Sequence, residues 1–212
     1  MLSSNRFRSA LAALAFSGLA WQATAASAVP EIGKPAPDFA ATDINGKPVK
    51  LSALRGKTVV LEWTNHECPY VVKHYGSGNM QALQRDATKD GVVWISIISS
   101  AKGAEGNVSP AEAAELTKSR KAAPSEIVLD EKGKIGRMYD ARTTPHMFVI
   151  NPQGNLVYMG GIDDKPTTRT SDIAGANNYV RAALDAVKAG KPVATPIARP
   201  YGCSVKYGPQ ES

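Results

Sequence analysis

Short runs of apolar residues recur along the chain and predict the strands of a sheet. The run at 58–63 (TVVLEW) is rich in β-branched and apolar residues, as expected of a buried strand. The run at 92–98 (VVWISII) is too apolar for an exposed edge, and a third run occupies 126–129. Two further strands are predicted at His146–Ile150 and Leu156–Gly160, and the NPQG turn sequence between them makes this pair a hairpin.

Segments with helix-boundary signals alternate with these strands. A helix is predicted over 78–89, and another begins at the sequence SPAE (109–112), which has capping-box spacing with proline at the first helical position. Further helices are predicted near 132–140 and over about 173–189. The alternation predicts an α/β fold, and the final hairpin predicts a mixed central sheet flanked by helices.

The segment before the first buried strand predicts a hairpin. Asn45-Gly46 lies between two short extended runs within residues 31–57. Both residue types tolerate positive φ, which makes this pair a strong hairpin signal. We therefore expect an N-terminal hairpin extension ahead of the sheet.

The first residues have the pattern of a bacterial secretory signal peptide. Arg6 and Arg8 precede an apolar stretch, and small residues offer cleavage after Ala25 or Ala28. The alternative is an uncleaved membrane anchor, but the apolar stretch is shorter than the roughly 20 residues that a spanning helix needs. We expect residues 1–25 to be removed, a periplasmic location that permits disulfides, and no stable membrane insertion afterwards.

The charge balance favours no nucleic-acid partner. The chain has 25 Lys and Arg against 19 Asp and Glu, for a net charge of +6. Cleavage after Ala25 takes away two arginines and no acids, so the net charge falls to +4. The basic residues are scattered rather than clustered, which argues against binding to nucleic acid.

Cys68 is the strongest candidate for chemistry. Pro69 has a fixed φ that suits the first helical position and steers the preceding residue away from helical geometry, so Cys68 is predicted at the N-cap of a helix. Unpaired amides and the positive end of the helix dipole favour the thiolate there, and the thiolate is the nucleophile. The alternative is an inert structural cysteine.

Two other positions complete the candidate site. Glu62 lies inside an apolar strand, where a carboxylate must be paired or protonated, and we expect it to act as a proton shuttle for a nearby sulfur. Its alternative is an exposed or salt-bridged position at a strand end. Thr144-Pro145 opens a strand, and a cis bond there would leave backbone groups free to pair with an extended substrate.

Several motifs together resemble one family. They are the N-terminal GKPAPDF and NGKPVKLSALRGKTVVLEW, Glu62, Cys68, Thr144-Pro145, GGIDD (160–164) and YGCSVKY (201–207). Over roughly residues 31 to 207 the chain is similar to the thioredoxin fold, and most of all to its peroxiredoxin-like and redoxin branch, the alkyl hydroperoxide reductase/thiol-specific antioxidant family. The resemblance implies a thioredoxin-like redoxin domain over 31–192, followed by a tail over 193–212 that carries Cys203.

The resemblance implies a thiol-dependent oxidoreductase, with two departures. Val71 replaces the second cysteine of Cys-x-x-Cys, and Leu61 and Asn65 stand where peroxiredoxins carry proline and Thr or Ser. In our working mechanism Cys68 attacks a protein disulfide or a peroxide, and Cys203 resolves the intermediate as a disulfide. Thr144, Pro145 and Pro69 form the substrate site, a thiol protein supplies or accepts electrons, and no cofactor is expected.

Two other functions remain open from the sequence. His66, Cys68 and His146 would suit copper or zinc if they converged. A permanent Cys68–Cys203 disulfide would instead make the protein a non-catalytic scaffold. Asp163 and Asp164, and Lys73 and His74, are expected to be solvated surface residues.

Overall fold

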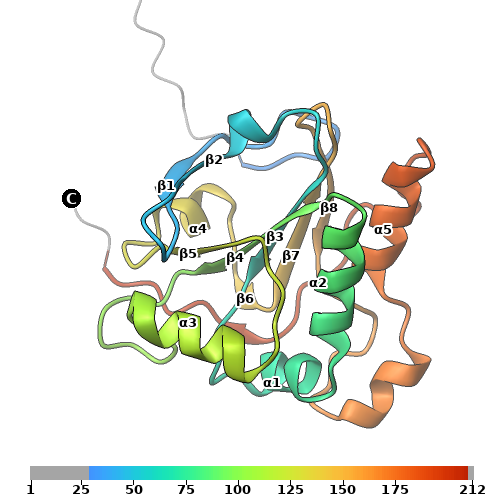
Figure 1. The fold of residues 1–212 in the computed structure, drawn as a ribbon. Coiled ribbons are helices and arrows are strands. Elements are labelled where there is room, and N and C mark those ends of the chain that lie inside the picture. Colours follow the sequence, from blue (N-terminus) through green and yellow to red (C-terminus); the bar gives the residue numbers. More distant parts are fainter. Residues whose placement is uncertain (1–28, 210–212) are drawn as a thin grey trace, which may run out of the picture.

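A mixed five-stranded sheet forms the centre of the molecule (Figure 1). The computed structural model describes residues 29–209. Strands β3 (Val59–Trp63), β4 (Val93–Ile98) and β5 (Glu126–Leu129) run parallel, whereas β7 (His146–Ile150) pairs antiparallel with both β3 and β8 (Leu156–Gly160). Their order is β5-β4-β3-β7-β8. The prediction of a mixed sheet in an α/β, thioredoxin-like fold is confirmed.

Helices and the N-terminal segment cover the two faces of this sheet. Alternate strand residues point to opposite faces, so Val60 and Val149 pack on one side, where α1 (Pro69–Gly76), α2 (Asn79–Lys89) and α5 (Tyr179–Lys188) contribute buried residues to the same cluster. Leu61 and Trp63 pack on the other side with residues of α4 (Lys134–Met138) and the N-terminal segment. The core is therefore double, with the sheet between its two halves.

The N-terminal hairpin forms as predicted. Strands β1 (Ala40–Thr42) and β2 (Pro48–Lys50) pair antiparallel, and η1 (Leu51–Leu54), a 3-10 helix, follows them. Gly46 in the turn has a φ of 82°, and the Asp43 carboxylate accepts hydrogen bonds from the turn amides. The turn therefore uses the positive φ that the Asn-Gly pair allows.

Two helices are shorter than the sequence predicts. The last helix is predicted over about 173–189, but α5 begins only at Tyr179, because the Asn178 side chain accepts a hydrogen bond from the Arg181 amide and caps it. The preceding residues form η2 (Thr170–Gly175), a 3-10 helix. The helix near 132–140 is likewise confined to α4, whereas α3 (Pro110–Ser119) has the predicted capping box at Ser109.

The C-terminal segment runs back across the molecule. Its strand β9 (Cys203–Ser204) pairs antiparallel with β6 (Thr143–Thr144), which immediately precedes β7. The red segment in Figure 1 follows this path below the sheet. Cys203 thereby reaches the strand that immediately precedes Pro145.

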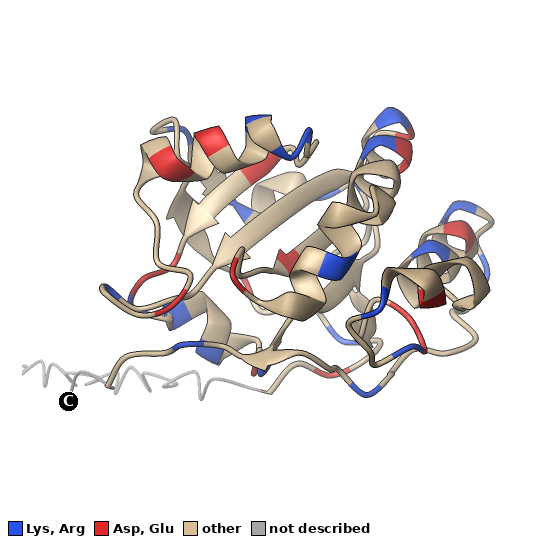
Figure 2. Ribbon diagram, turned by 90° about the horizontal axis from the view of Figure 1, so that it is seen from below, with Lys and Arg blue, Asp and Glu red and all other residues tan. Residues whose placement is uncertain are grey.

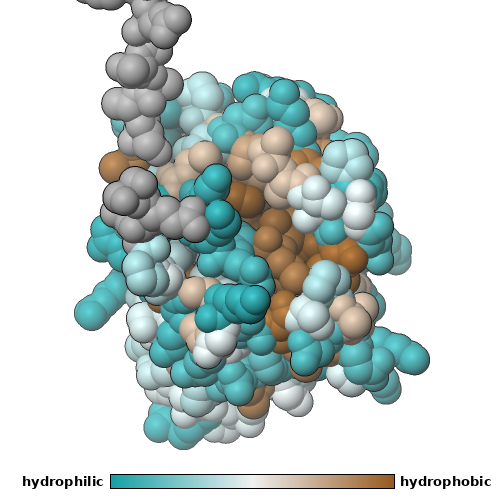
Figure 3. Space-filling view, turned by 90° about the vertical axis from the view of Figure 1, so that its left-hand side faces the viewer, coloured by the Kyte–Doolittle hydropathy of each residue, from teal (hydrophilic) through white to brown (hydrophobic). Residues whose placement is uncertain are grey.

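Surface charges and apolar groups are distributed differently. Acidic and basic positions are interspersed along helices and loops (Figure 2). Apolar side chains gather in a hollow on the side that carries β1, β5 and α3 (Figure 3). A third core cluster contains buried Val108 and Ile127 with half-buried Ile44, Leu116 and Leu129. Within residues 29–209 no helix is long and apolar enough to cross a bilayer. The predicted signal peptide and its cleavage sites lie outside the described residues.

Candidate active site

Cys68 is the N-cap residue of α1, as the sequence predicts. Its φ of −70° and ψ of 123° are extended, and Pro69 occupies the first helical turn. The Cys68 carbonyl accepts the first helical hydrogen bond, from the Val72 amide. The cysteine side chain is fully buried, whereas Pro69 is exposed.

Cys68 and Cys203, which lie 135 positions apart in the sequence, form a disulfide. The Cα atoms lie 5.9 Å apart, within the usual range. The Cys203 amide donates to the Cys68 sulfur at 3.4 Å, and half-buried Cys203 covers Cys68. In this oxidised form the sulfur makes no capping hydrogen bond to the helix amides.

Thr144 and Pro145 lie directly against this disulfide. The Thr144 carbonyl oxygen is 3.2 Å from the Cys68 sulfur, a contact that becomes a hydrogen bond only when a thiol proton is present. Strand pairing places Thr144 opposite Cys203, and the Thr144–Pro145 bond is cis. The tail strand thus occupies the backbone groups that we expected an extended substrate to use.

Glu62 is buried behind α1 and is bound by four neutral side chains. Its carboxylate accepts hydrogen bonds from the Tyr75 hydroxyl at 2.8 Å and the Trp94 indole at 2.8 Å. Gln84 and Ser96 donate at 3.1 and 3.0 Å. The carboxylate is therefore paired, as a buried charge must be, and not exposed at a strand end. None of these four hydrogen bonds reaches either sulfur.

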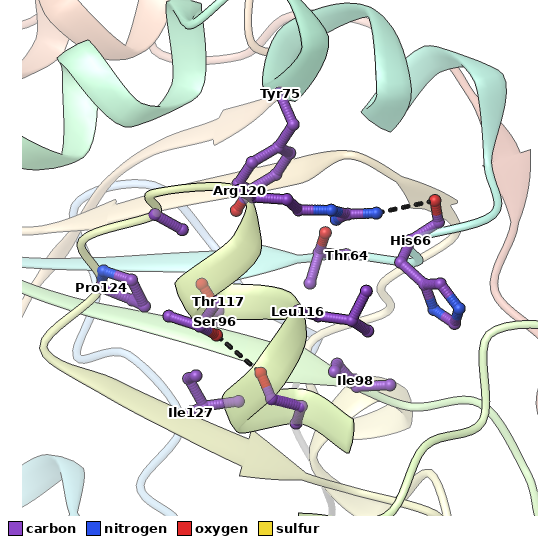
Figure 4. A pocket seen from close by; sticks show the side chains of 12 residues that line it. Thr64, His66, Tyr75, Ser96, Ile98, Leu116, Thr117, Arg120, Pro124 and Ile127 are labelled. Atoms are coloured by element: carbon purple, nitrogen blue, oxygen red, sulfur yellow. Dashed lines mark hydrogen bonds between the residues drawn. The ribbon is translucent and has the colours of Figure 1, made fainter. Parts of the chain in front are cut away.

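A small cavity of about 40 Å³ lies between α3 and the sheet, next to the Glu62 cluster. Tyr75 and Ser96 line it, and Arg120 lies over the Tyr75 ring, with its guanidinium 5.1 Å from the ring centre (Figure 4). Arg120 also donates to the His66 carbonyl at 3.0 Å. Two of the four groups that bind Glu62 therefore form part of the cavity wall.

The three residues considered for metal binding do not converge. The His66 ring lines the cavity, whereas the His146 ring packs on Phe148 at 4.5 Å. The His146 Nδ1 accepts the Arg142 amide. Within residues 29–209 no cluster of three His, Cys, Asp or Glu side chains could hold a metal ion.

Lys73, His74 and Asp163 are buried, which corrects the expectation that they are solvated. The Lys73 ammonium donates to the Lys165 carbonyl at 2.8 Å. His74 Nε2 lies 3.9 Å from the Asp163 carboxylate. Burial lowers the pKa of His74 to about 4, with nearby Lys73 adding to this effect and Asp163 opposing it. Asp164 remains half-buried and binds Asn177.

Tyr201 in the tail is a residue of the site that the sequence did not single out. Its hydroxyl donates to Asp163 at 2.5 Å, and its ring lies 5.8 Å from that of Tyr70 on α1. Burial, with the Asp163 carboxylate, raises the pKa of Tyr201. The adjacent Gly202 was the available signal of an unusual backbone at this point in the tail. Its φ of 138° is a conformation that requires glycine.

Known proteins resemble both the sequence and this fold. The model of the AhpC/TSA family matches residues 32–159. The thiol-disulfide oxidoreductase ResA of Bacillus subtilis (strain 168) is 28% identical over 132 residues, which cover 59% of this chain and 64% of that protein. The chain thus matches less than two thirds of this relative's length.

Two crystal structures share the fold over most of the chain. An uncharacterized conserved protein from Geobacillus kaustophilus has a TM-score of 0.71 and 27% identity, covering 85% of this chain and 94% of its own. A hypothetical protein from Sinorhizobium meliloti 1021 has a TM-score of 0.70 and 23% identity, with coverage of 84% and 95%. The latter similarity supports the fold alone.

Proposed function

The chain belongs to the AhpC/TSA family, and on this premise we propose that it is a thiol–disulfide oxidoreductase with Cys68 as nucleophile and Cys203 as resolving cysteine. The observation that carries the proposal is the disulfide between these two residues at the start of α1. An inert disulfide needs no helix N-terminus. A nucleophilic thiolate gains from one, because the helix dipole and free amides stabilise its charge.

The forward half-reaction begins with the reduced protein. The Cys68 thiolate attacks one sulfur of a substrate disulfide, forms a mixed disulfide and expels the other substrate sulfur as a thiolate. The Cys203 thiolate then attacks the Cys68 sulfur and expels the second substrate thiolate. The substrate is thereby reduced by two electrons and the Cys68–Cys203 disulfide forms.

The return half-reaction begins at Cys203. Cys68 is fully buried in the oxidised protein, whereas Cys203 is half-buried. A reductant thiolate therefore attacks the Cys203 sulfur and expels Cys68, which is the better leaving group because its thiolate lies at the helix N-terminus. A second reductant thiolate then attacks the reductant sulfur of this mixed disulfide, forms the reductant disulfide and expels Cys203 as a thiolate.

Glu62 enters this cycle as the proton shuttle. Its burial behind α1 supports the role, because a carboxyl group held in one position can pass a proton to a reacting group directly or through one water. Its hydrogen bonds are to Tyr75, Gln84, Trp94 and Ser96, so transfer to a sulfur requires an intervening water. Thr144, Pro145 and exposed Pro69 form the substrate surface in the same proposal.

Disulfide exchange fits the site better than peroxide reduction. Leu61 is a core residue, and the Asn65 side chain is engaged by Glu105 and by the Glu67 amide. Neither supplies the hydroxyl group that peroxiredoxins place at the second of these positions. The partners in this proposal are a thiol protein and an oxidised protein, and a periplasmic location suits them because disulfides persist there.

Trapping experiments test the proposal. Reduced Cys203→Ser protein is expected to accumulate a mixed disulfide at Cys68 with glutathione disulfide, whereas reduced wild type closes Cys68–Cys203. The rate of reaction of reduced protein with hydrogen peroxide is measured in parallel. A faster reaction with peroxide than with glutathione disulfide would favour the antioxidant alternative. The scaffold alternative predicts a disulfide that a dithiol reduces only after unfolding, with a potential below about −300 mV. That result would overturn the proposed function.

A further inference from the structure

A cluster of buried polar groups beside the disulfide has no part in the cycle above. It joins the tail, through Tyr201, to His74 on α1 and to Asp163 after β8. We call Tyr201, His74, Asp163 and Asn79 the tyrosine clasp. His74 and Asp163 are fully or almost fully buried, with exposed fractions of 0% and 3%.

The hydrogen bonds of the clasp have a defined direction. The Asn79 side-chain amide donates to His74 Nδ1 at 2.9 Å, so the neutral imidazole carries its proton on Nε2. That proton is donated to the Tyr201 hydroxyl oxygen at 3.2 Å. The hydroxyl proton is donated in turn to Asp163 at 2.5 Å. The Tyr201 hydroxyl therefore both accepts and donates, and phenylalanine can replace neither bond.

Only one residue separates the clasp from Cys203. Gly202 has a φ of 138° and lies so close to β6 that a Cβ there would be 2.0 Å from the Thr144 carbonyl oxygen. The backbone between Tyr201 and Cys203 is thus fixed at both ends. The position of Tyr201 therefore limits where the backbone of Cys203 can lie.

We propose that Tyr201 is a positioning residue, which holds Cys203 at the Cys68 sulfur through its bonds to Asp163 and His74. The inference rests on the proposed function and identifies what makes the resolving step efficient. A tail that is docked before the bond forms has lost its freedom already, so ring closure costs less entropy. The clasp thereby raises the effective concentration of Cys203.

The test is the equilibrium of the Cys68–Cys203 disulfide in glutathione redox buffers. Tyr201→Phe is expected to lower the effective concentration of Cys203 at least tenfold, because a hydrogen bond to a charged group is lost. Each tenfold change raises the reduction potential by about 30 mV. The matched control is Tyr139→Phe, which likewise loses a part-buried hydroxyl bond, to the Pro37 carbonyl, but makes none of the hydrogen bonds of the tyrosine clasp.

A double variant separates positioning from general loosening. If Tyr201 and Asp163 act through the hydrogen bond between them, Asp163→Asn shifts the reduction potential of the disulfide less in the Tyr201→Phe background than in the wild type. Equal shifts for Tyr201→Phe and Tyr139→Phe, or no shift in a folded Tyr201→Phe protein, would overturn the proposal. Wild-type protein that a dithiol cannot reduce while folded would instead refute the redox function itself.

Discussion

Acid is expected to destabilise the folded protein in a window set by two buried histidines. His74 and His146 both have a pKa lowered from 6.5 to about 4, and burial of the ring is the largest cause in each case. The unfolded chain binds protons at both positions as the pH falls through 6.5. The folded chain does not bind them until about pH 4.

The sign and the size follow from this difference. A base whose folded pKa is depressed contributes stability that is complete above pH 6.5 and is lost as the pH falls towards 4. The difference between a pKa of 6.5 and one of about 4 corresponds to about 3 kcal/mol per histidine. With both groups, the free energy of unfolding falls by up to about 2.7 kcal/mol per pH unit near pH 5. That loss is large against a typical total of about 5–15 kcal/mol.

Urea unfolding of the oxidised protein between pH 7 and 5 measures the effect. The acids with lowered pKa values do not interfere, because their ordinary values of 3.8 and 4.5 lie below this pH range and their contribution is lost at lower pH; they are Asp43, Asp90, Asp164, Asp172 and Glu112. His146→Gln is expected to halve the pH slope. A wild-type stability that stays flat from pH 7 to 5 would refute the reasoning, as would a slope that His146→Gln leaves intact.

Three further results are expected. Gly202→Ala should prevent closure of the Cys68–Cys203 disulfide in folded protein, because the new Cβ would be 2.0 Å from the Thr144 carbonyl oxygen. Peptide mapping without reduction measures closure, and normal closure would count against so close an approach of the tail to β6. Glu62→Gln should lower the free energy of unfolding by about 1–3 kcal/mol, since its amide group would face hydrogen-bond donors, and chemical denaturation measures the loss. A monothiol added to oxidised protein and quenched early should be found on Cys203; an adduct on Cys68 would contradict attack at the more exposed sulfur.

Local signals predicted the fold and half of the site. The apolar runs predicted the strands, and Pro69 predicted the N-cap position of Cys68, because both depend on neighbouring residues. The burial of His74 and Asp163 was not predictable in this way. It depends on Tyr201, which lies 127 positions after His74 and reaches it only because the tail folds back. A polar residue that is covered by a distant segment looks solvated in its own sequence context.

Because Val71 replaces the second cysteine of the Cys-x-x-Cys motif, a second thiol has to come from elsewhere in the fold. Val71 at that position is fully buried in the same cluster as Cys68, so it packs the helix against the sheet. In the proposed cycle the resolving thiol is instead Cys203, on a strand that pairs with Thr144, where we expect the substrate backbone to bind. On this proposal, substrate and resolving cysteine compete for one place. The tail would leave before Cys68 reacts and return before the mixed disulfide is resolved, which would couple tail docking to redox state by reciprocal linkage. An anchor such as Tyr201 consequently has an optimum strength, because tighter docking speeds resolution but slows substrate entry.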